Sequence, residues 1–139
     1  MRTINENTIT ASRVADAARL SFLPTYFGRD MMYVETAIFR HMSELCESYH
    51  GGFWHFYELS NGGAFMAPAS DAPLAIGVYG NHYSGTMSAE AAGITATLFA
   101  LSHLTFNYPD ADVLIERFHQ LRDFAADHAE SSAIFAAID

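Results

Sequence analysis

No other segment limits the possible folds as strongly as residues 88–106. Apolar side chains occur on every side of this predicted helix, whereas a surface helix would show a single apolar stripe. They are Ala91, Ala92, Ile94, Leu98, Phe99, Leu101 and Leu104. A helix that is apolar nearly all round is buried. Ser88 is a suitable N-cap and Glu90 suits the first turn, so we expect a central helix that the remaining elements cover.

Four strand-like segments precede this helix. Residues 53–60 carry apolar and aromatic bulk in both alternating sets of positions, which predicts a central strand covered on both faces. The dipeptide Asn61-Gly62 is a favoured hairpin turn, after which the chain returns through residues 64–67. Further strands are expected over residues 74–78 and 83–87. Together these segments predict a four-stranded antiparallel meander.

Helices are expected on both sides of the meander. Before it, apolar residues recur every three to four positions over residues 31–49, and Asp30 could cap this helix. Pro24 favours the end of any earlier helix. After the central helix, the apolar spacing over residues 111–125 and 132–138 predicts two more helices.

The sequence therefore predicts an α+β fold with an N-terminal helix, the four-stranded meander, and two or three C-terminal helices packed on the sheet. A length of 139 residues fits one domain. Residues 1–21 are polar and show only weak helical spacing. We expect them to form a weakly ordered N-terminal arm, with a single domain over residues 22–139.

The charge pattern excludes recognition of nucleic acid through its phosphates. The chain has seven basic residues, all of them arginine, against 16 acidic residues, and its formal net charge is −9. Phosphate binding depends on a basic patch that releases counterions. We therefore expect no direct binding of nucleic acid. Apolar residues make up 50% of the sequence, which excludes intrinsic disorder.

Cysteine content and hydropathy exclude further classes. The single Cys46 cannot form an internal disulfide or a cysteine-based zinc site. The first residues lack the apolar stretch of a signal peptide, and no apolar run reaches the roughly 18 residues of a membrane span. We expect a cytoplasmic protein without a membrane partner, a metal or a cofactor.

Seven histidines keep a small histidine-dependent enzyme open as an alternative. His41, His50 and His55 lie near one another in the sequence, and His119 precedes Asp123 by one helical turn. None of these spacings matches a known metal or nucleophile motif. The sequence therefore identifies no catalytic residue and no metal ligand.

Two features of the acidic residues have more than one interpretation. Glu58 interrupts an apolar strand, and a buried carboxylate needs hydrogen bonds or an arginine. Arg29 or Arg40 could supply the charge of a structural pair, or Glu58 could contact a partner. Residues 110–139 carry seven acidic residues against two arginines. That density is thin for an acidic DNA mimic, which needs a regular row of carboxylates.

Several runs of residues from Phe22 to the end of the chain match a known family. They are Phe22-Leu23-Pro24, Phe27-Gly28-Arg29, Gly51-Gly52-Phe53-Trp54, Tyr57-Glu58-Leu59-Ser60-Asn61-Gly62-Gly63, Met66-Ala67-Pro68, Ser88-Ala89-Glu90-Ala91-Ala92-Gly93-Ile94, Thr97-Leu98-Phe99-Ala100-Leu101, Leu121-Arg122-Asp123-Phe124-Ala125-Ala126 and Ile134-Phe135-Ala136-Ala137-Ile138-Asp139. In these runs the sequence resembles the ArdB/KlcA family of antirestriction proteins. Residues 1–21 carry none of the resemblance.

The resemblance implies an α+β protein that protects the DNA of plasmids and other mobile elements from host type I restriction systems. It implies action through protein contacts or an indirect pathway, and neither DNA binding nor strongly charged mimicry. The partner is then the host type I restriction-modification enzyme, met directly or indirectly. The resemblance supplies no catalytic residues. We expect a monomer or a weak homodimer.

Polar residues within the matching runs are the candidates for a contact surface. They are Arg29, Glu58, Asn61, Arg122, Asp123 and Asp139. Turn formation explains Asn61, pairing could explain Arg29 and Glu58, and surface charge could explain the two residues at 122 and 123. Asp139 is the least explained by folding, because a terminal residue rarely matters for stability.

Overall fold

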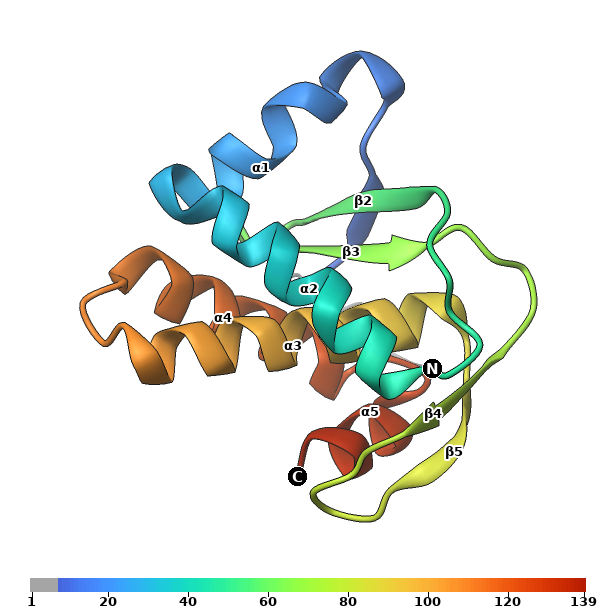
Figure 1. Cartoon of the computed structure of the whole chain (residues 1–139). Helices are drawn as coiled ribbons and strands as arrows, with labels where there is room; N and C mark the ends of the chain where they lie inside the picture. Colours follow the sequence, from blue (N-terminus) through green and yellow to red (C-terminus); the bar gives the residue numbers. More distant parts are fainter. Residues whose placement is uncertain (1–7) are drawn as a thin grey trace, which may run out of the picture.

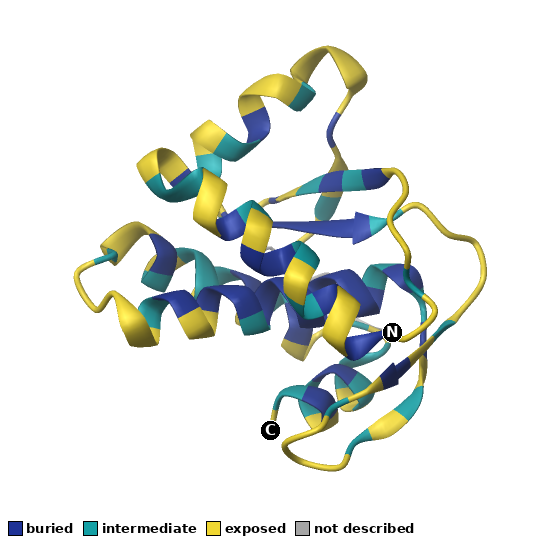
Figure 2. Cartoon of the chain, viewed as in Figure 1, coloured by how far each residue is buried: buried dark blue, intermediate teal, exposed yellow. Residues whose placement is uncertain are grey.

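The computed structural model describes residues 8–139 and places one long helix at the centre of the molecule (Figure 1). This helix, α3, spans Ala89–Asn107 and packs against helices and strands on several sides. Most of its residues are buried (Figure 2). Ser88 is the N-cap, since its hydroxyl accepts a hydrogen bond from the Ala91 N–H at 3.1 Å. The predicted buried central helix and its cap are confirmed.

The strands form two separate antiparallel sheets. The three-stranded sheet has the order β1 (Ala11–Arg13), β2 (Trp54–Leu59), β3 (Ala64–Pro68). The two-stranded sheet joins β4 (Leu74–Gly77) to β5 (Ser84–Met87). The α+β class is confirmed, and β2 is the middle strand as expected. Its predicted cover on both faces is wrong, because His55 and Tyr57 on one face are only half-buried. The single four-stranded meander is also wrong.

The free edge of β3 explains why β4 does not continue the first sheet. Helix α3 covers this edge: the Met66 N–H points at the Thr97 hydroxyl, 3.5 Å away, and Pro68 has no N–H to offer. Gly93 allows the close approach, because a Cβ there would collide with the backbone of β3. With that edge occupied, the chain after β3 pairs only with itself.

Part of the predicted N-terminal arm forms a strand. Residues 1–7 of the arm lie outside the described residues. In the remainder, β1 pairs with β2 in the register Ser12 opposite Glu58, and the buried Val14 donates its N–H to the Phe56 carbonyl at 2.8 Å. A 3₁₀ turn over Asp16–Ala18 then leads into a helix.

This helix, α1, spans Arg19–Phe27 and contains Pro24, so the expected helix stop is wrong. The local preference against a helix is overcome by packing: Phe22 and Phe27 are buried, and Phe22 stacks on Phe56 with ring centroids 4.6 Å apart. The helix ends at Gly28, which has φ +58°. A second 3₁₀ turn spans Gly28–Asp30.

The next helix, α2, spans Met31–Leu45 and buries one face, as its periodicity predicts. It ends before the expected Tyr49, because Cys46 adopts an extended backbone and begins a turn whose Tyr49 N–H donates to the Cys46 carbonyl. Asp30 lies at the N-cap position but makes no capping hydrogen bond. Among residues 8–139, no helix is both long and apolar enough to span a bilayer.

Two C-terminal helices complete the fold and pack on α3. They are α4 (Asp112–Ala126) and α5 (Ser131–Ile138), close to the predicted bounds. In Figure 1, α5 lies beside the β4–β5 hairpin. Asn81 in that hairpin's turn donates from its amide nitrogen to the Ala137 carbonyl at 2.8 Å, which fixes α5 to the second sheet.

Candidate functional site

The six residues predicted to form a contact surface do not form one cluster. Glu58 and Asn61 lie together at the end of β2 and in the turn that follows it. Arg29 lies in the turn before α2, with its side chain 88% exposed. The other three are on the C-terminal helices or directly after them.

Asn61 connects the β2–β3 turn to α4. Its Oδ1 accepts from the Gly63 N–H at 3.0 Å and its Nδ2 donates to the Gln120 carbonyl at 2.9 Å. The Gln120 side chain returns a hydrogen bond to the Asn61 carbonyl at 2.9 Å, and Arg117 donates to the Gln120 side chain at 3.0 Å. Both polar atoms of the Asn61 side-chain amide thus make hydrogen bonds within the fold.

Glu58 is exposed, and the structure does not pair it with an arginine. The expected pair with Arg29 or Arg40 is wrong: within the described chain, Arg29 lies 3.9 Å from the carboxylate of its neighbour Asp30. Glu58 instead lies near Tyr26, whose pKa is raised by burial and then by the Glu58 carboxylate. No ion pair therefore occupies the carboxylate of Glu58 in residues 8–139.

Arg122, Asp123 and Asp139 are exposed. The Arg122 guanidinium lies over the Phe135 ring, 5.4 Å from its centroid. The Asp139 N–H donates to the Phe135 carbonyl at 3.0 Å, which is the last hydrogen bond of α5. Arg122 and Asp139 thus both contact Phe135, although no bond joins them in the described structure.

The histidines of the enzyme alternative are dispersed. His41 lies between α2 and α3, where its ring stacks on Phe99 and its Nε2 is buried without a hydrogen-bond partner. His119 is exposed, and within residues 8–139 it makes no ion pair with Asp123. No three His, Cys, Asp or Glu side chains of the described chain are grouped as metal ligands.

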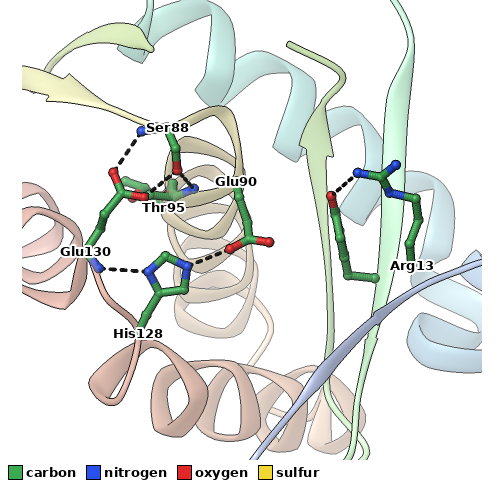
Figure 3. A network of polar contacts seen from close by, with 8 residues as sticks. Arg13, Ser88, Glu90, Thr95, His128 and Glu130 are labelled. Carbon is green, nitrogen blue, oxygen red and sulfur yellow. Dashed lines mark hydrogen bonds and ion pairs between the residues drawn. The ribbon is translucent and has the colours of Figure 1, made fainter. Parts of the chain in front are cut away.

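A second polar network lies at the N-terminus of α3 (Figure 3). Glu130 accepts from the Ser88 N–H at 2.8 Å through Oε1 and from the Ser88 hydroxyl through Oε2. His128 lies 2.7 Å from the Glu90 carboxylate through Nε2, and its Nδ1 accepts from the Glu130 N–H at 2.9 Å. The network fastens the loop between α4 and α5 to the start of α3.

The hydrogen bonds assign the tautomer of His128. Because Nδ1 accepts from a backbone N–H, the ring proton is on Nε2 and is donated to Glu90. This bond lowers the pKa of Glu90, and burial opposes the shift. The Ser88 hydroxyl donates to Glu130, so His128 does not act on it as a base. The network therefore caps α3 through Ser88 and orients the Glu90 carboxylate through His128.

A polar cleft of about 500 Å³ adjoins this network. Arg13, His55 and Tyr57 line it from the three-stranded sheet, and Glu90 lines it from α3. Arg13 donates to the Tyr57 hydroxyl at 3.1 Å. The pKa of His55 is lowered by burial, then by the charges of Arg13 and Arg19. Ser70 and Asp71 line it from the loop after β3. We call this space the Arg13–Glu90 cleft.

Sequence reasoning missed this cleft and the network behind it. The sequence predicts a helix that starts at Ser88 and Glu90, but their partners His128 and Glu130 lie about 40 residues further on. Arg13 belongs to the predicted arm, outside the matching runs. The only local signal was the Ser88–Glu90 capping pattern itself.

Comparison with known proteins gives one consistent family. The model of the antirestriction protein family matches residues 47–139. Two Escherichia coli proteins called antirestriction protein KlcA are 56% and 52% identical to this chain. Each match covers 94% of this chain, and the two matches cover 94% and 95% of the respective relatives.

A solved structure matches the whole chain. It is 52% identical, covers 100% of both chains and has a TM-score of 0.89. Its description says that the KlcA and ArdB proteins show a novel fold and antirestriction activity against type I DNA restriction systems in vivo but not in vitro. Family model, relatives and fold therefore agree that this chain belongs to the ArdB/KlcA family of antirestriction proteins.

Proposed function

We propose that this chain protects incoming DNA from the host's type I restriction systems inside the cell. The observation that supports the proposal most strongly is the likeness to the KlcA and ArdB structure over the full length of both chains, with 52% identity. The TM-score of 0.89 means that the whole fold is shared. The proposed site of action is the cytoplasm, where entering DNA meets the restriction enzyme.

The protection is proposed to be indirect or to act through protein contacts, and not through DNA binding or catalysis. Activity of the relatives in vivo but not in vitro favours a pathway that needs other cellular components. The scarcity of basic residues in a chain of net charge −9 argues against phosphate contacts. The host type I restriction-modification enzyme is the partner whose activity is changed, and the protein acts as a monomer or a weak homodimer.

The candidate contact residues differ in how far the fold accounts for them. The side chain of Asn61 makes its hydrogen bonds to the β2–β3 turn and to α4. Arg29, Asp123 and Asp139 are exposed, and surface placement is what a contact residue needs. Glu58 and Arg122 are also exposed, but Glu58 lies near Tyr26 and the Arg122 guanidinium lies over the Phe135 ring. We therefore propose Arg29, Asp123 and Asp139 as the first residues to test.

The experiment is the plating efficiency of unmodified phage on a type I restricting host, with and without this gene. Methylation of host DNA is measured in the same cells. Restored plating with normal methylation is the expected result, because the protein then interferes with cleavage or with DNA translocation. Unchanged plating, with folded protein present in the lysate, would overturn the proposal.

A second arm separates indirect from direct action. The purified protein is added to purified type I enzyme and unmodified DNA, and cleavage is followed. Indirect action predicts unchanged cleavage in this assay alongside protection in cells. Inhibition of the purified enzyme would instead place the contact on the enzyme.

Charge mimicry and histidine chemistry are tested by substitution. Asparagine or glutamine in place of Asp110, Asp112, Glu116 and Asp127 removes four negative charges near α4. Protection that survives this change excludes a mimic in that region. Protection that survives His119→Ala and His55→Ala in the same assay counts against an enzyme that uses either histidine.

A further inference from the structure

A groove between α2 and α3 gathers exposed apolar side chains. Met32 and Tyr33 lie on the first turn of α2 and Tyr108 directly after α3, each with more than half of its surface exposed. Figure 2 shows the end of α3 and the loop after it as largely exposed. The groove has a volume of about 430 Å³, and buried Leu104 forms part of its floor. We call this space, which Arg40 also lines, the α2–α3 groove. Large exposed apolar side chains that gather in one groove mark an interaction surface.

The two tyrosines and the arginine of this groove make no polar or ring contact within residues 8–139. In that part of the chain, the rings of Tyr33 and Tyr108 pair with no other aromatic ring, and their hydroxyls make no hydrogen bond. Arg40 makes neither an ion pair nor a cation–π contact there. Tyrosine, arginine and methionine are the side chains that are enriched at the centres of protein interfaces. These groups are therefore available to a partner.

Two other titratable groups border the groove, and the fold already holds both of them. At the end of the groove where Arg40 lies, the His103 ring meets the His41 ring with centroids 5.9 Å apart, and its Nε2 is 3.1 Å from the Asn107 amide nitrogen. At the other end, the Asp30 side chain is only 30% exposed and its carboxylate is 3.9 Å from the guanidinium of the preceding arginine. Arg40 is thus the unpaired charge, and a carboxylate is the group that would pair with it.

A small pit adjoins the groove at the end away from Arg40. Tyr33, Leu104 and Tyr108 line both spaces, and buried Leu114 closes the pit, whose volume is about 90 Å³. An apolar cavity of about 150 Å³ accommodates benzene, so this smaller pit suits an aliphatic side chain better than an aromatic ring. Tyr33 and Arg40 are seven residues apart on α2, which corresponds to about 10 Å along the helix axis.

We propose that the α2–α3 groove binds an amphipathic helix of a second protein, which carries an aliphatic anchor and a carboxylate two helical turns apart. The anchor fills the pit and the carboxylate pairs with Arg40, because helix positions i and i+7 share a face and are about 10 Å apart. A groove between two helices accepts a third helix by the packing that joins helices within a fold. The proposal does not depend on the antirestriction proposal, since it concerns binding by the purified chain.

The test is selection from a phage-displayed library of amphipathic helical peptides on the purified full chain. Peptides enriched on the parent are expected to share an aliphatic residue and an aspartate or glutamate seven positions away. Peptides enriched on Arg40→Glu are expected to carry lysine or arginine in place of the acid, because the charge of the groove is reversed. Three outcomes would overturn the proposal: no enrichment on the parent, parent binders without this pattern, or the same binders on both chains.

The affinity of one selected peptide for parent and variant chains then assigns the contacts. Tyr33→Ser is expected to weaken binding at least about tenfold, as the loss of a tyrosine anchor does. Arg40→Gln is expected to weaken it about two- to fivefold and to reduce its salt dependence, because an exposed ion pair is weak and screened. Tyr79→Ser removes a fully exposed tyrosine outside the groove and is the matched control, with unchanged binding. Unchanged binding by Tyr33→Ser would contradict the proposed site.

Sedimentation of the chain alone distinguishes a second protein from a second copy. An antiparallel copy seated on the groove would bring Arg40 of each chain toward Asp30 of the other. We expect parent and Arg40→Glu to sediment alike, because the groove is proposed to serve a different protein. A parent dimer that dissociates in Arg40→Glu would overturn that assignment. Both Tyr33 and Arg40 are exposed, so their variants are expected to keep the fold, which thermal unfolding checks.

Discussion

Gly93 lies where α3 comes closest to β3. A Cβ at this position would be 2.5 Å from the Cα and Cβ of Ala67, and closer still to the Met66 carbonyl oxygen. Two of these atoms belong to the backbone of a buried strand, which cannot rotate away as a side chain can. Glycine is required here for space, and the distance between helix and sheet depends on it.

Gly93→Ala is therefore expected to lower the free energy of unfolding by about 1–3 kcal/mol, the usual range for overpacking. The loss should appear although alanine favours a helix by about 1 kcal/mol. Urea unfolding measures it. Gly80→Ala is the control, because open space surrounds that glycine. A Gly93→Ala variant as stable as the parent would contradict the described packing of α3 on β3.

His41 is a polar residue in an apolar contact. Its Nε2 is buried without a partner, and its ring lies against Phe99 and His103. Burial lowers the pKa of His41 from its ordinary value of 6.5; Arg40 and His103 act in the same direction, and Glu44 opposes them. The native state therefore favours the neutral ring.

Stability is expected to fall as the pH drops below 6.5, the value from which the pKa of His41 is lowered. In that window the unfolded chain binds a proton that the folded chain does not, so the free energy of unfolding increases with pH. His41→Phe should reduce the loss of unfolding free energy between about pH 7.5 and about pH 5.5. His119→Gln, at an exposed histidine, should leave it unchanged. Equal pH dependence in parent and His41→Phe would contradict the assignment.

At the level of elements, the bond between Ser88 and Glu130 holds together parts of the chain that are far apart in sequence. Ser88 caps α3, and the Glu130 carboxylate precedes α5, so the loop after α4 is fixed to the central helix. Removing the hydroxyl removes both the cap and one of the two hydrogen bonds that Glu130 accepts from Ser88.

Ser88→Ala is expected to cost about 1–2 kcal/mol of unfolding free energy. Hydrogen exchange should also accelerate in α5 more than in α2, because the anchor of the C-terminal helix is weakened. Ser102→Ala, on an exposed position of the same helix, is the matched control. Unchanged exchange in α5 would show that Asn81 and the core hold this helix without Ser88.

Elements that carry their own apolar pattern could be predicted from the sequence. The all-round apolar pattern of α3, the periodicity of α2 and α4, and the Asn61-Gly62 turn each indicate their structure locally. β1 could not be predicted, because Ala11–Arg13 is three residues long and becomes a strand only by pairing with β2. Packing of Phe22 likewise overrides the local effect of Pro24.

At the scale of the whole molecule, the six candidate contact residues lie on different elements. Side-chain hydrogen bonds within the fold explain the presence of Asn61, whereas the contact that Asp139 makes is a backbone hydrogen bond, which any residue could make. Glu58 and Asn61 could be picked out by residue type, but their surroundings depend on Tyr26 and Gln120, which no spacing connects to them. The Arg13–Glu90 cleft was unpredictable for the same reason. Its residues come from β1, β2, α3 and the loop after β3, and only the fold brings them together.

Deletion of Asp139 is expected to separate function from stability. The residue is exposed and contributes one backbone hydrogen bond at the end of α5, so the melting temperature should stay nearly unchanged. Protection of unmodified phage should decrease if Asp139 is a contact residue. Asp127→Asn, at another exposed acidic residue, controls for loss of charge. Full protection by the truncated protein would remove Asp139 from the contact surface.

The covering of β3 by α3 also governs how copies of this chain can aggregate. Sheets grow between molecules when an exposed strand offers its backbone groups to a neighbour. Thr97, Gly93 and Pro68 close one side of the three-stranded sheet, so polymerisation through that side would first require α3 to leave the core. Among residues 8–139, the opposite side is formed by the three residues of β1. Together with the mutual repulsion of chains at net charge −9, this leaves little template for a fibre that grows through the three-stranded sheet.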